Sequence, residues 1–327
     1  MKALVQDRYG SPNVLRIQEV PTPVAGADEV LVRVRAASVN ARDWHLMRGE
    51  PRLARLDRTT FGLRAPRSRI RGTDFAGTVE SVGSGVTAWR PGDGVYGEAD
   101  GALAEQVAAR ADVIAAKPDS ATWEEAAAIP LAATTALTLL RAVDTEAGQR
   151  VLVNGASGGV GTFAVQLAKS AGLHVTAVCS GRNAELVGSL GADVVVDYGR
   201  QDFATTGERH DLVVDLVGNR SLRDLRRALA PTGTLVLSGG GVSGQGRFVG
   251  PLGLMTRAQV VARLSGLRVK VPMAVPSGDD LAELAARVDA GSLRPVVERT
   301  FALDDAAEAI RYLEVEHARA KVVVTVG

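Results

Sequence analysis

The sequence predicts an α/β protein with two parts, a β-rich barrel and a doubly wound parallel sheet. From Met1 to about Ser120, valine-rich runs lie between glycines, which is typical of short strands joined by tight turns. From Arg150 onward, apolar strands alternate with helical stretches, the pattern of parallel strands linked by crossover helices. A glycine-rich turn lies between the first of these strands and its helix.

The N-terminal part shows the alternation of half-buried strands. Val30, Val32 and Val34 fall on one face of a predicted strand, and Arg33 and Arg35 fall on the other with Leu31. Pro91-Gly92-Asp93-Gly94 is a strong turn signal. We therefore expect a compact, irregular β-barrel here.

The second part predicts six parallel strands. They are Val151–Asn154, Val175–Cys179, Val194–Asp197, Leu212–Leu216, Thr234–Ser238 and one near Val269–Val271. The remaining elements break this alternation and are expected to return to the first domain. They are a helix at Asp279–Ala290, a strand at Val296–Phe301, a helix at Ala306–Glu314 and a strand at Lys321–Val326.

The stretch VLVNGASGGVGTFAVQLAK, residues 151–169, joins a buried strand to a helix through a turn that contains Gly155, Gly158, Gly159 and Gly161. Small residues let the backbone approach a pyrophosphate, and the helix N-terminus presents free N–H groups to it. The order strand, glycine turn, helix predicts a dinucleotide-binding turn. A tight turn that binds no ligand is the alternative.

The end of the second strand predicts which nicotinamide cofactor binds. An acid about 20 residues after the glycine turn selects NAD through the ribose 2′-hydroxyl. This chain has Cys179-Ser180-Gly181-Arg182-Asn183 there, with no acid before Glu185. Ser180 and Arg182 can bind a 2′-phosphate, so we expect NADPH over NADH. Alternatively, Arg182 caps the following helix and the choice of cofactor is loose.

Composition excludes several classes of function. A formal net charge of +1, with 46% hydrophobic and 23% charged residues, describes a globular protein with no general affinity for nucleic acid or membranes. Cys179 is the only cysteine, so no intrachain disulfide forms. The N-terminus lacks a signal-peptide core, and the apolar run from Ala126 to Leu140 is too short to span a bilayer. These features predict a cytoplasmic protein.

The segment from Arg48 to Arg71 holds eight arginines against two acids, Glu50 and Asp57. One interpretation is a solvated surface loop. The other is a basic rim that attracts an anionic substrate or the cofactor phosphates. Phe61 is the only aromatic residue in this run, which makes nucleic-acid binding through stacked bases a poor explanation.

The potential metal ligands are too scattered for a catalytic zinc site. The histidines are His45, His174, His210 and His317, and no two of them have ligand spacing. Cys179 falls on the predicted cofactor strand. The sequence therefore predicts no metal.

Several motifs in order resemble the medium-chain dehydrogenase/reductase superfamily, in its zinc-free quinone oxidoreductase-like branch. They are Ser38-Val39-Asn40 with Asp43, Gly72-Thr73-Asp74-Phe75-Ala76-Gly77-Thr78-Val79, Val82-Gly83, Gly92-Asp93, Pro130-Leu131 with Thr134-Thr135-Ala136, the glycine turn, and Ala320-Lys321-Val322-Val323. In zinc-dependent members a cysteine stands at the position of Asn40, and a His-Glu pair stands at Thr73-Asp74. The resemblance implies a GroES-like β-barrel catalytic domain at 1–122 and 273–327, a Rossmann NADP-binding domain at 123–272, a cleft between them for the nicotinamide, and a homodimer.

The resemblance also implies the cofactor-binding residues. Asn40, Thr134 and Lys321 would lie near the nicotinamide, and Ser157, Gly158, Gly159 and Val160 would cradle the pyrophosphate. Ser180 and Arg182 would hold the 2′-phosphate, Tyr198 would lie on the adenine side, Leu216, Val217 and Gly218 would flank the adenosine, and Ser238 and Gly239 would approach the carboxamide. Leu216 and Val217 have strand core as their alternative, and Lys321 has a surface charge. Asp74 and Asp93 are interpreted as structural turn residues.

Relatives in this branch commonly reduce quinones or the carbon–carbon double bond of α,β-unsaturated carbonyls, which implies the same hydride transfer here. Without zinc, the developing oxyanion needs hydrogen-bond donors. Some relatives have a tyrosine at the position of His45, so His45 is a candidate donor, with Asn40 beside it and Trp44 as a flat wall for the substrate. His45 on the surface and Trp44 in the core is the alternative. Two further functions stay open, a ketone or aldehyde reductase and a non-catalytic NADPH-binding redox sensor.

Overall fold

The computed structural model describes residues 1–57, 60–238, 251–316 and 318–327. It contains two compact units. Unit 1 comprises Met1–Thr134 and Val275–Gly327, and unit 2 comprises Thr135–Ala274. The domain boundaries expected from the sequence, after residue 122 and before residue 273, stay a prediction.

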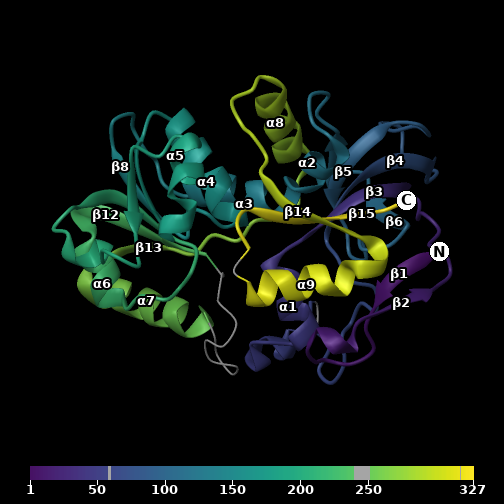
Figure 1. Ribbon diagram of the computed structural model, residues 1–327, viewed down its shortest axis with the longest axis horizontal. Helices are drawn as coiled ribbons and strands as arrows, with labels where there is room; N and C mark the ends of the chain where they lie inside the picture. Colours follow the sequence, from purple (N-terminus) through teal and green to yellow (C-terminus); the bar gives the residue numbers. More distant parts are fainter. Residues whose placement is uncertain (58–59, 239–250, 317) are drawn as a thin grey trace. The chain divides into compact units, whose positions relative to one another are not determined.

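Unit 1 is built on a seven-stranded sheet (Figure 1). Its strands run in the order β14 (Val297–Ala302), β15 (Lys321–Thr325), β3 (Glu29–Val39), β4 (Asp74–Val82), β5 (Gly94–Glu98) and β7 (Ile114–Ala116), and β6 (Gln106–Arg110) pairs with β3. A separate hairpin joins β1 (Lys2–Val5) to β2 (Arg16–Glu19). The C-terminal strand β15 pairs antiparallel with β3 in this sheet.

The long strand β3 shows how the sequence forms this sheet. Val30, Val32 and Val34 are buried while Arg33 and Arg35 are exposed, as the alternation predicts. From Ala36 to Val39 every residue is buried, so the end of the strand lies inside the unit rather than on its surface. This end leads directly into Asn40 and the next helix.

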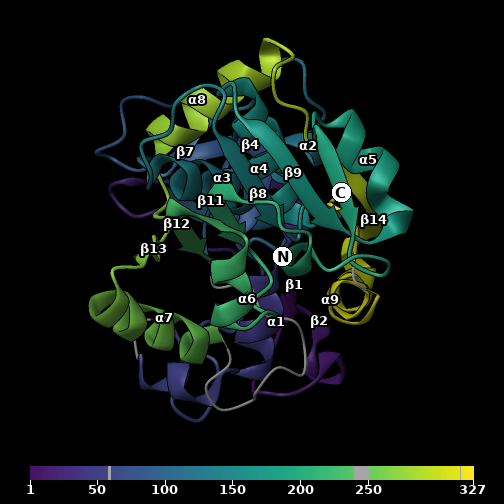
Figure 2. The ribbon, with the colours of Figure 1, turned by 90° about the vertical axis from the view of Figure 1, so that its left-hand side faces the viewer.

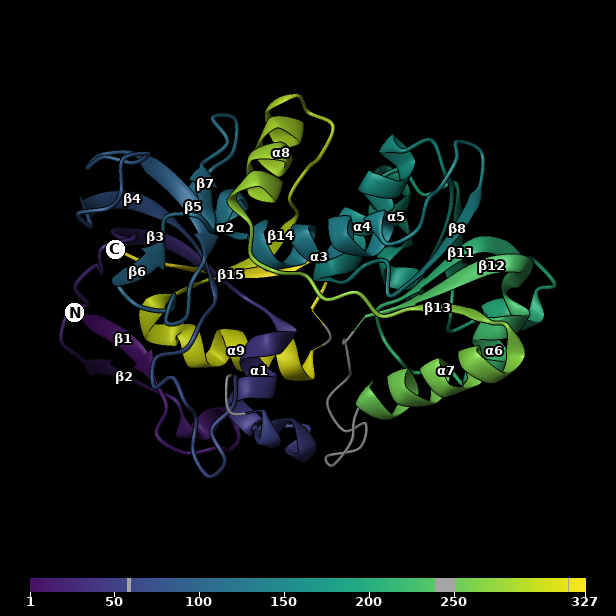
Figure 3. The ribbon, with the colours of Figure 1, turned by 180° about the vertical axis from the view of Figure 1, so that it is seen from behind.

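The helices of unit 1 are α1 (Ala41–Arg48), α2 (Trp123–Ala127), α8 (Gly278–Asp289) and α9 (Ala306–Val315), and α3 (Pro130–Arg141) begins here and continues into unit 2. Short 3₁₀ turns lie at Pro12–Val14, Arg52–Leu56 and Leu303–Asp305. Helices α1 and α9 lie side by side in Figures 1 and 3, and an ion pair between Arg48 and the buried Glu314 joins them. The hydrophobic core of unit 1 contains Val32, Phe75 and Val322.

Unit 2 is a doubly wound parallel sheet, as predicted. The strand order is β10 (Val194–Asp197), β9 (His174–Cys179), β8 (Arg150–Asn154), β11 (His210–Asp215), β12 (Leu229–Leu237) and β13 (Arg268–Lys270), with all neighbours parallel. Figure 2 shows this order from β9 to β13. Helices α4 (Gly159–Ser170) and α5 (Ala184–Ser189) cover one face, and α6 (Leu222–Arg227) and α7 (Pro251–Ser265) cover the other (Figure 3). Short 3₁₀ turns follow β9 at Gly181–Asn183 and β10 at Phe203–Thr205.

Within the described ranges, none of the helices combines the length and the apolar character that crossing a bilayer requires.

Candidate active site

The order of the strands in unit 2 marks one edge of its sheet as a binding edge. The chain proceeds from β8 through β9 to β10, then crosses to the opposite side of β8 to form β11. Such a reversal opens a crevice beyond the carboxyl ends of the two central strands, where α/β proteins bind their ligands. The glycine turn follows β8 at this edge, and Leu216 and Val217 follow β11.

Two glycines of the turn are required by the fold itself. Gly155 has a φ of +90°, and a Cβ there would lie 2.7 Å from Cγ2 of Val217. A Cβ on Gly161 would lie 2.1 Å from the carbonyl oxygen of Gly155. Both contacts are too short for real atoms, so these positions accept only glycine. They let the turn fold back tightly onto the start of α4.

Gly158 differs, because its own chain does not demand a glycine. A Cβ there would meet nothing closer than 3.4 Å, an ordinary van der Waals contact. Gly158 is the N-cap of α4 and provides no side-chain cap, so amides of the first turn of the helix lack an intrahelical partner. A side chain at 158 would fill the space in front of these amides. Backbone N–H groups at a helix N-terminus are groups that bind phosphate.

The four residues predicted to cradle the pyrophosphate are therefore together at the N-terminus of α4. They are Ser157, Gly158, Gly159 and Val160, and all four are half-buried. The hydroxyl of Ser157 accepts a hydrogen bond from Nδ2 of Asn183, at 3.0 Å. Asn183 lies in the turn after β9, so this bond ties the glycine turn to the predicted ribose site.

The predicted 2′-phosphate site lies at the end of β9. Ser180 is half-buried and Arg182 is exposed in the 3₁₀ turn that follows the strand. An acid that the sequence analysis missed also lies here. The carboxylate of Asp197, at the end of β10, accepts hydrogen bonds from the N–H groups of Gly181 at 3.0 Å and Gly199 at 2.9 Å. Asp197 is distant along the chain from the residues that follow β9, but β10 is the neighbour of β9 and its carboxyl end lies beside them.

Asp197 is thus committed to the backbone rather than presented alone to a ribose. Beside it, Tyr198 is 58% exposed. A free carboxylate would compete with a 2′-phosphate, whereas one that accepts two N–H groups has part of its acceptor capacity already used.

The structure corrects the strand-core alternative for two residues that follow β11. Leu216 and Val217 are not strand core, because β11 ends at Asp215 and both residues are half-buried in the turn beyond it. The Oδ1 atom of Asp215 accepts from the N–H groups of Val217 and Gly218, both at 3.1 Å, and so bends the chain out of the sheet. Ser238 follows β12 and is half-buried, whereas Gly239 lies outside the described residues.

In unit 1, Lys321 is the centre of a buried polar cluster, here named the Lys321 cluster (Lys321, Asn40, Asp74 and Ser38). Lys321 is 2% exposed, and its Nζ donates to Oδ1 of Asn40 and lies 3.5 Å from Oδ2 of Asp74. The interpretation of Lys321 as a surface charge is therefore wrong. Lys321 is the first residue of β15, a strand whose next three residues are buried valines. Its aliphatic stem and its ammonium therefore lie inside the unit.

The interpretation of Asp74 as a turn residue is also wrong. Asp74 is the first residue of β4 and has no exposed surface. Its carboxylate accepts from Oγ of Ser38 at 3.2 Å and from the N–H of Leu131 at 3.3 Å. Asp93 does act as a turn residue, since its carboxylate accepts from the N–H of Arg90 at 2.9 Å.

Strand register explains how these side chains meet. Asp74 pairs with Ser38 across β3 and β4, and with Glu98 across β4 and β5. Burial raises the pKa of Asp74 and lowers that of Lys321, and each charge partly offsets the effect on the other. Burial, and then the charge of Asp74, raise the pKa of Glu98 to about 8. Glu98 was not predicted from the sequence, although a single acid at the end of the apolar run Val95–Gly97 was the available signal.

Asn40 and Thr134, both predicted near the nicotinamide, are buried in unit 1. The N–H of Asn40 donates to the carboxylate of Asp43 at 2.7 Å, which fixes the start of α1 and leaves the amide oxygen to Lys321. Burial raises the pKa of Asp43 to about 6.

The hydroxyl of Thr134 is buried and has no hydrogen-bond partner in the described part of the chain. Buried polar groups rarely stay unpaired, so this hydroxyl is a candidate ligand contact.

His45 and Trp44, predicted near the substrate, occupy different environments. Trp44 is 6% exposed and belongs to the hydrophobic core. This burial favours core packing over the predicted role as a wall for the substrate. His45 is half-buried and stacks on Trp44 with ring centroids 3.7 Å apart. Its Nδ1–H donates to the carbonyl of Glu50 at 2.8 Å, and its Nε2 is buried without a partner in the described residues. Burial lowers the pKa of His45, which favours the neutral ring.

Potential metal ligands do not gather in the described residues. No group of three or more His, Cys, Asp or Glu side chains that could hold a metal ion occurs among them. Cys179 is buried on β9, and His210 is buried with its Nε2 3.1 Å from the hydroxyl of Thr176. Of the residues at the positions of zinc ligands, Asn40 and Asp74 are engaged by the ammonium of Lys321, and Thr73 offers only a hydroxyl. This side-chain set does not fit a catalytic zinc ion.

Comparisons with known proteins agree with both parts of the fold. Residues 26–130 match the family described as alcohol dehydrogenase GroES-like domain, and residues 190–324 match the one described as zinc-binding dehydrogenase. The mitochondrial NAD(P)H oxidoreductase RTN4IP1 of Mus musculus is 34% identical over 100% of this chain and 89% of its own length.

Two further proteins resemble the whole chain. The chloroplastic NADPH-dependent alkenal/one oxidoreductase of Arabidopsis thaliana is 31% identical over 99% of this chain and 79% of its own length. The solved structure of the quinone oxidoreductase from Coxiella burnetii superposes with a TM-score of 0.87, at 30% identity, over 100% of this chain and 99% of that one.

Proposed function

Because the chain belongs to the quinone oxidoreductase-like branch of the medium-chain dehydrogenase/reductase superfamily, we propose that it reduces quinones or the C=C bond of α,β-unsaturated carbonyls with NADPH. The observation that carries this proposal is the glycine turn. Its packing requires glycine at 155 and 161, while the glycine at 158 leaves space in front of the uncapped first turn of α4.

Unit 2 supplies the cofactor contacts in this proposal. The amides around Ser157, Gly158, Gly159 and Val160 bind the pyrophosphate, and Ser180 and Arg182 bind the 2′-phosphate. Tyr198, Leu216, Val217, Ser238 and Gly239 stay predicted contacts of the adenosine and carboxamide ends. When bound, NADPH supplies a hydride from C4 of its nicotinamide ring.

Unit 1 supplies the hydrogen-bond donors that the reduced substrate needs. Negative charge develops on the carbonyl or quinone oxygen during the reaction, and preorganised donors in a dry site stabilise it. The buried hydroxyl of Thr134 has no partner among the described residues, and the Lys321 ammonium is buried beside Asn40. We assign Asn40, Thr134 and Lys321 to the nicotinamide region, with His45 and Trp44 as catalytic candidates. In this mechanism no step requires a metal ion.

A ketone or aldehyde reductase and a redox sensor that only binds NADPH remain the alternatives. We further propose a cytoplasmic homodimer, with domains 1–122 plus 273–327 and 123–272.

The experiment that decides among these functions is NADPH oxidation, followed at 340 nm, with a panel of quinones, enones, ketones and aldehydes. We expect turnover with quinones or enones. Turnover with ketones or aldehydes only would favour the first alternative, and tight NADPH binding without turnover would favour the second.

A further inference from the structure

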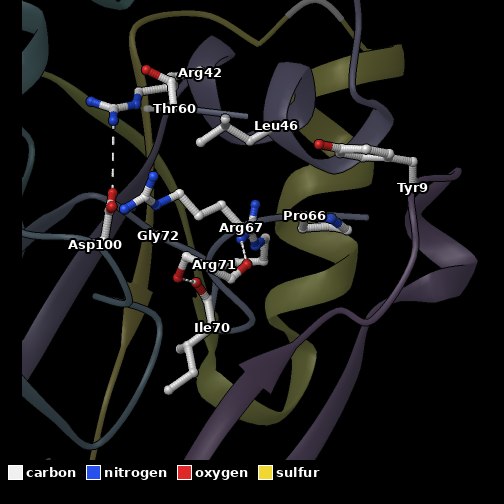
Figure 4. Close-up of a pocket in the computed structure, with 11 residues that line it drawn as sticks. Tyr9, Arg42, Leu46, Thr60, Pro66, Arg67, Ile70, Arg71, Gly72 and Asp100 are labelled. Atoms are coloured by element: carbon white, nitrogen blue, oxygen red, sulfur yellow. Dashed lines mark hydrogen bonds and ion pairs between the residues drawn. The ribbon is translucent and has the colours of Figure 1, made fainter. Parts of the chain in front are cut away.

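A small pocket in unit 1 lies against the arginine-rich segment (Figure 4). Arg42 on α1 and Arg67 and Arg71 from the segment line it, together with Asp100, Leu46 and Ile70. Its volume is about 20 Å³, slightly more than one water molecule requires, so it admits one small chemical group.

Arg71 is the unusual member of this lining. It is only 4% exposed, and its Nε is buried without a hydrogen-bond partner in the described residues. One terminal nitrogen of the same guanidinium donates to the carbonyl of Ser68. A buried guanidinium with an unused donor is costly, because charged groups inside proteins are normally paired. A ligand acceptor in the pocket would pair it.

The backbone around Arg71 holds this guanidinium in a fixed place. The N–H of Arg71 donates to the carbonyl of Leu4 at 2.9 Å, and its carbonyl accepts from Leu103 at 2.9 Å. Gly72, which follows, has a φ of +96°, and a Cβ there would lie 2.4 Å from the backbone nitrogen of Leu103. The chain approaches closely at this point, so the pocket wall is preorganised rather than a loose loop.

Arg42, which also lines the pocket, has the same unpaired donor as Arg71. Its Nε is also buried without a partner in the described residues, and its terminal nitrogen is 3.7 Å from Oδ1 of Asp100. Figure 4 marks this ion pair with a dashed line. Asp100 is two-thirds exposed, so the two buried Nε atoms of Arg42 and Arg71 face one solvated carboxylate in this lining. Asp43 is the other acid that acts on Arg71, and it is bound to the N–H of Asn40.

We propose that this pocket binds the carboxylate of a small-molecule substrate through Arg71 and Arg42. A planar carboxylate matches the fork of an arginine, and it is small enough for the cavity. Ile70 and Leu46 provide apolar surface beside it. This inference deepens the proposed function by naming the substrate class, an enone or quinone that carries a carboxylate.

The first test measures binding and does not depend on activity. Calorimetry compares benzoate with its neutral analogue benzamide on the wild type, on Arg71→Met and on Arg69→Met. Arg69 is the matched control, because it lies in the same segment, is exposed and pairs with Asp7 rather than lining the pocket. We expect benzoate to bind and benzamide not to, and Arg71→Met to weaken benzoate binding by about tenfold or more. Arg69→Met should bind benzoate like the wild type.

Equal binding of benzamide, no binding of benzoate, or an equal loss in both variants would overturn the proposal. If Arg71→Met does not fold, Arg42→Met makes the same test from the other side of the pocket.

The second test is the ratio of kcat/KM for 3-benzoylacrylate to that for its ethyl ester. We expect Arg71→Met to lower this ratio by about tenfold or more and Arg69→Met to retain it. If the enzyme reduces no acceptor, the proposed function fails while the benzoate measurement still decides the pocket.

Discussion

The ammonium of Lys321 lies 3.5 Å from the carboxylate of Asp74, and both side chains are buried although 247 residues separate them along the chain. Strand β3 lies between the strands that carry them, and its residue Ser38 pairs with Asp74 of β4 on one side and with Val323 of β15 on the other. The C-terminal strand therefore does more than extend the sheet of unit 1. It brings the one ammonium of the Lys321 cluster to two buried groups of the N-terminal segment.

Replacing Lys321 with Met should destabilise the protein strongly. The change leaves the Asp74 carboxylate buried without its cation, which typically costs about 3–5 kcal/mol of the free energy of unfolding. Urea unfolding measures the loss. Lys2→Met is the control, because it removes an exposed ion pair with Asp304 and should cost less than about 1 kcal/mol. Similar losses in the two variants would mean that the buried pair contributes no more than a surface pair.

Glu98 should make stability fall as the pH rises. Its pKa in the folded protein is raised to about 8, from 4.5 as the ordinary value, so the folded state holds the proton more tightly than the unfolded state. Its contribution to stability is complete below about pH 4.5 and is lost as the pH rises through about 8. Glu98→Gln, which mimics the protonated acid, should match the wild type at pH 5 and exceed it at pH 9 in urea unfolding. An unchanged difference at the two pH values would contradict this assignment.

The sequence was sufficient for the fold because periodic patterns carry that information. The alternation in β3 and the strand–helix order after Arg150 correspond to the observed sheets. Most strand ends are shifted by a residue or two, as at Asp215, but β12 begins at Leu229, five residues before the expected start at Thr234. The polar clusters were harder to predict. Whether Asp74 meets Lys321 or Glu98, or Asp197 meets Gly181, depends on which strands are neighbours and in what register, and local composition does not encode that.

The glycine turn gives a prediction that separates folding from binding. Gly161→Ala forces a Cβ against the carbonyl of Gly155, so it should lower stability by about 1–3 kcal/mol. Gly158→Ala meets no such contact, so its stability should stay within about 1 kcal/mol of the wild type. Its methyl group would fill the space before the first turn of α4, so we expect the Kd for NADPH to rise roughly tenfold or more. Chemical unfolding and fluorescence titration with NADPH measure the two effects. Unchanged NADPH affinity in Gly158→Ala would argue against a phosphate at this helix.

Arg182 should control the preference for NADPH over NADH. Charge-assisted hydrogen bonds to a 2′-phosphate are worth about 1.5–3 kcal/mol, so Arg182→Gln should raise the KM for NADPH roughly tenfold or more and leave that for NADH nearly unchanged. Arg200→Gln is the matched control, because Arg200 is exposed near the same edge and pairs with Asp197. A loss of NADPH preference in the control as well would show that general positive charge, rather than Arg182, selects the cofactor.

His45 offers a test that distinguishes its two ring nitrogens. Nδ1–H donates to the carbonyl of Glu50, and Asn at this position can supply an equivalent N–H, whereas Nε2 has no counterpart in Asn. If Nε2 meets the substrate, both His45→Ala and His45→Asn should lower kcat, roughly a hundredfold, with little change in the Kd for NADPH. Single-turnover kinetics with a quinone or enone, together with NADPH titration, measure both. Turnover at the wild-type level in His45→Asn, with a loss in His45→Ala only, would show that His45 serves to hold the end of α1 and takes no part in the chemistry.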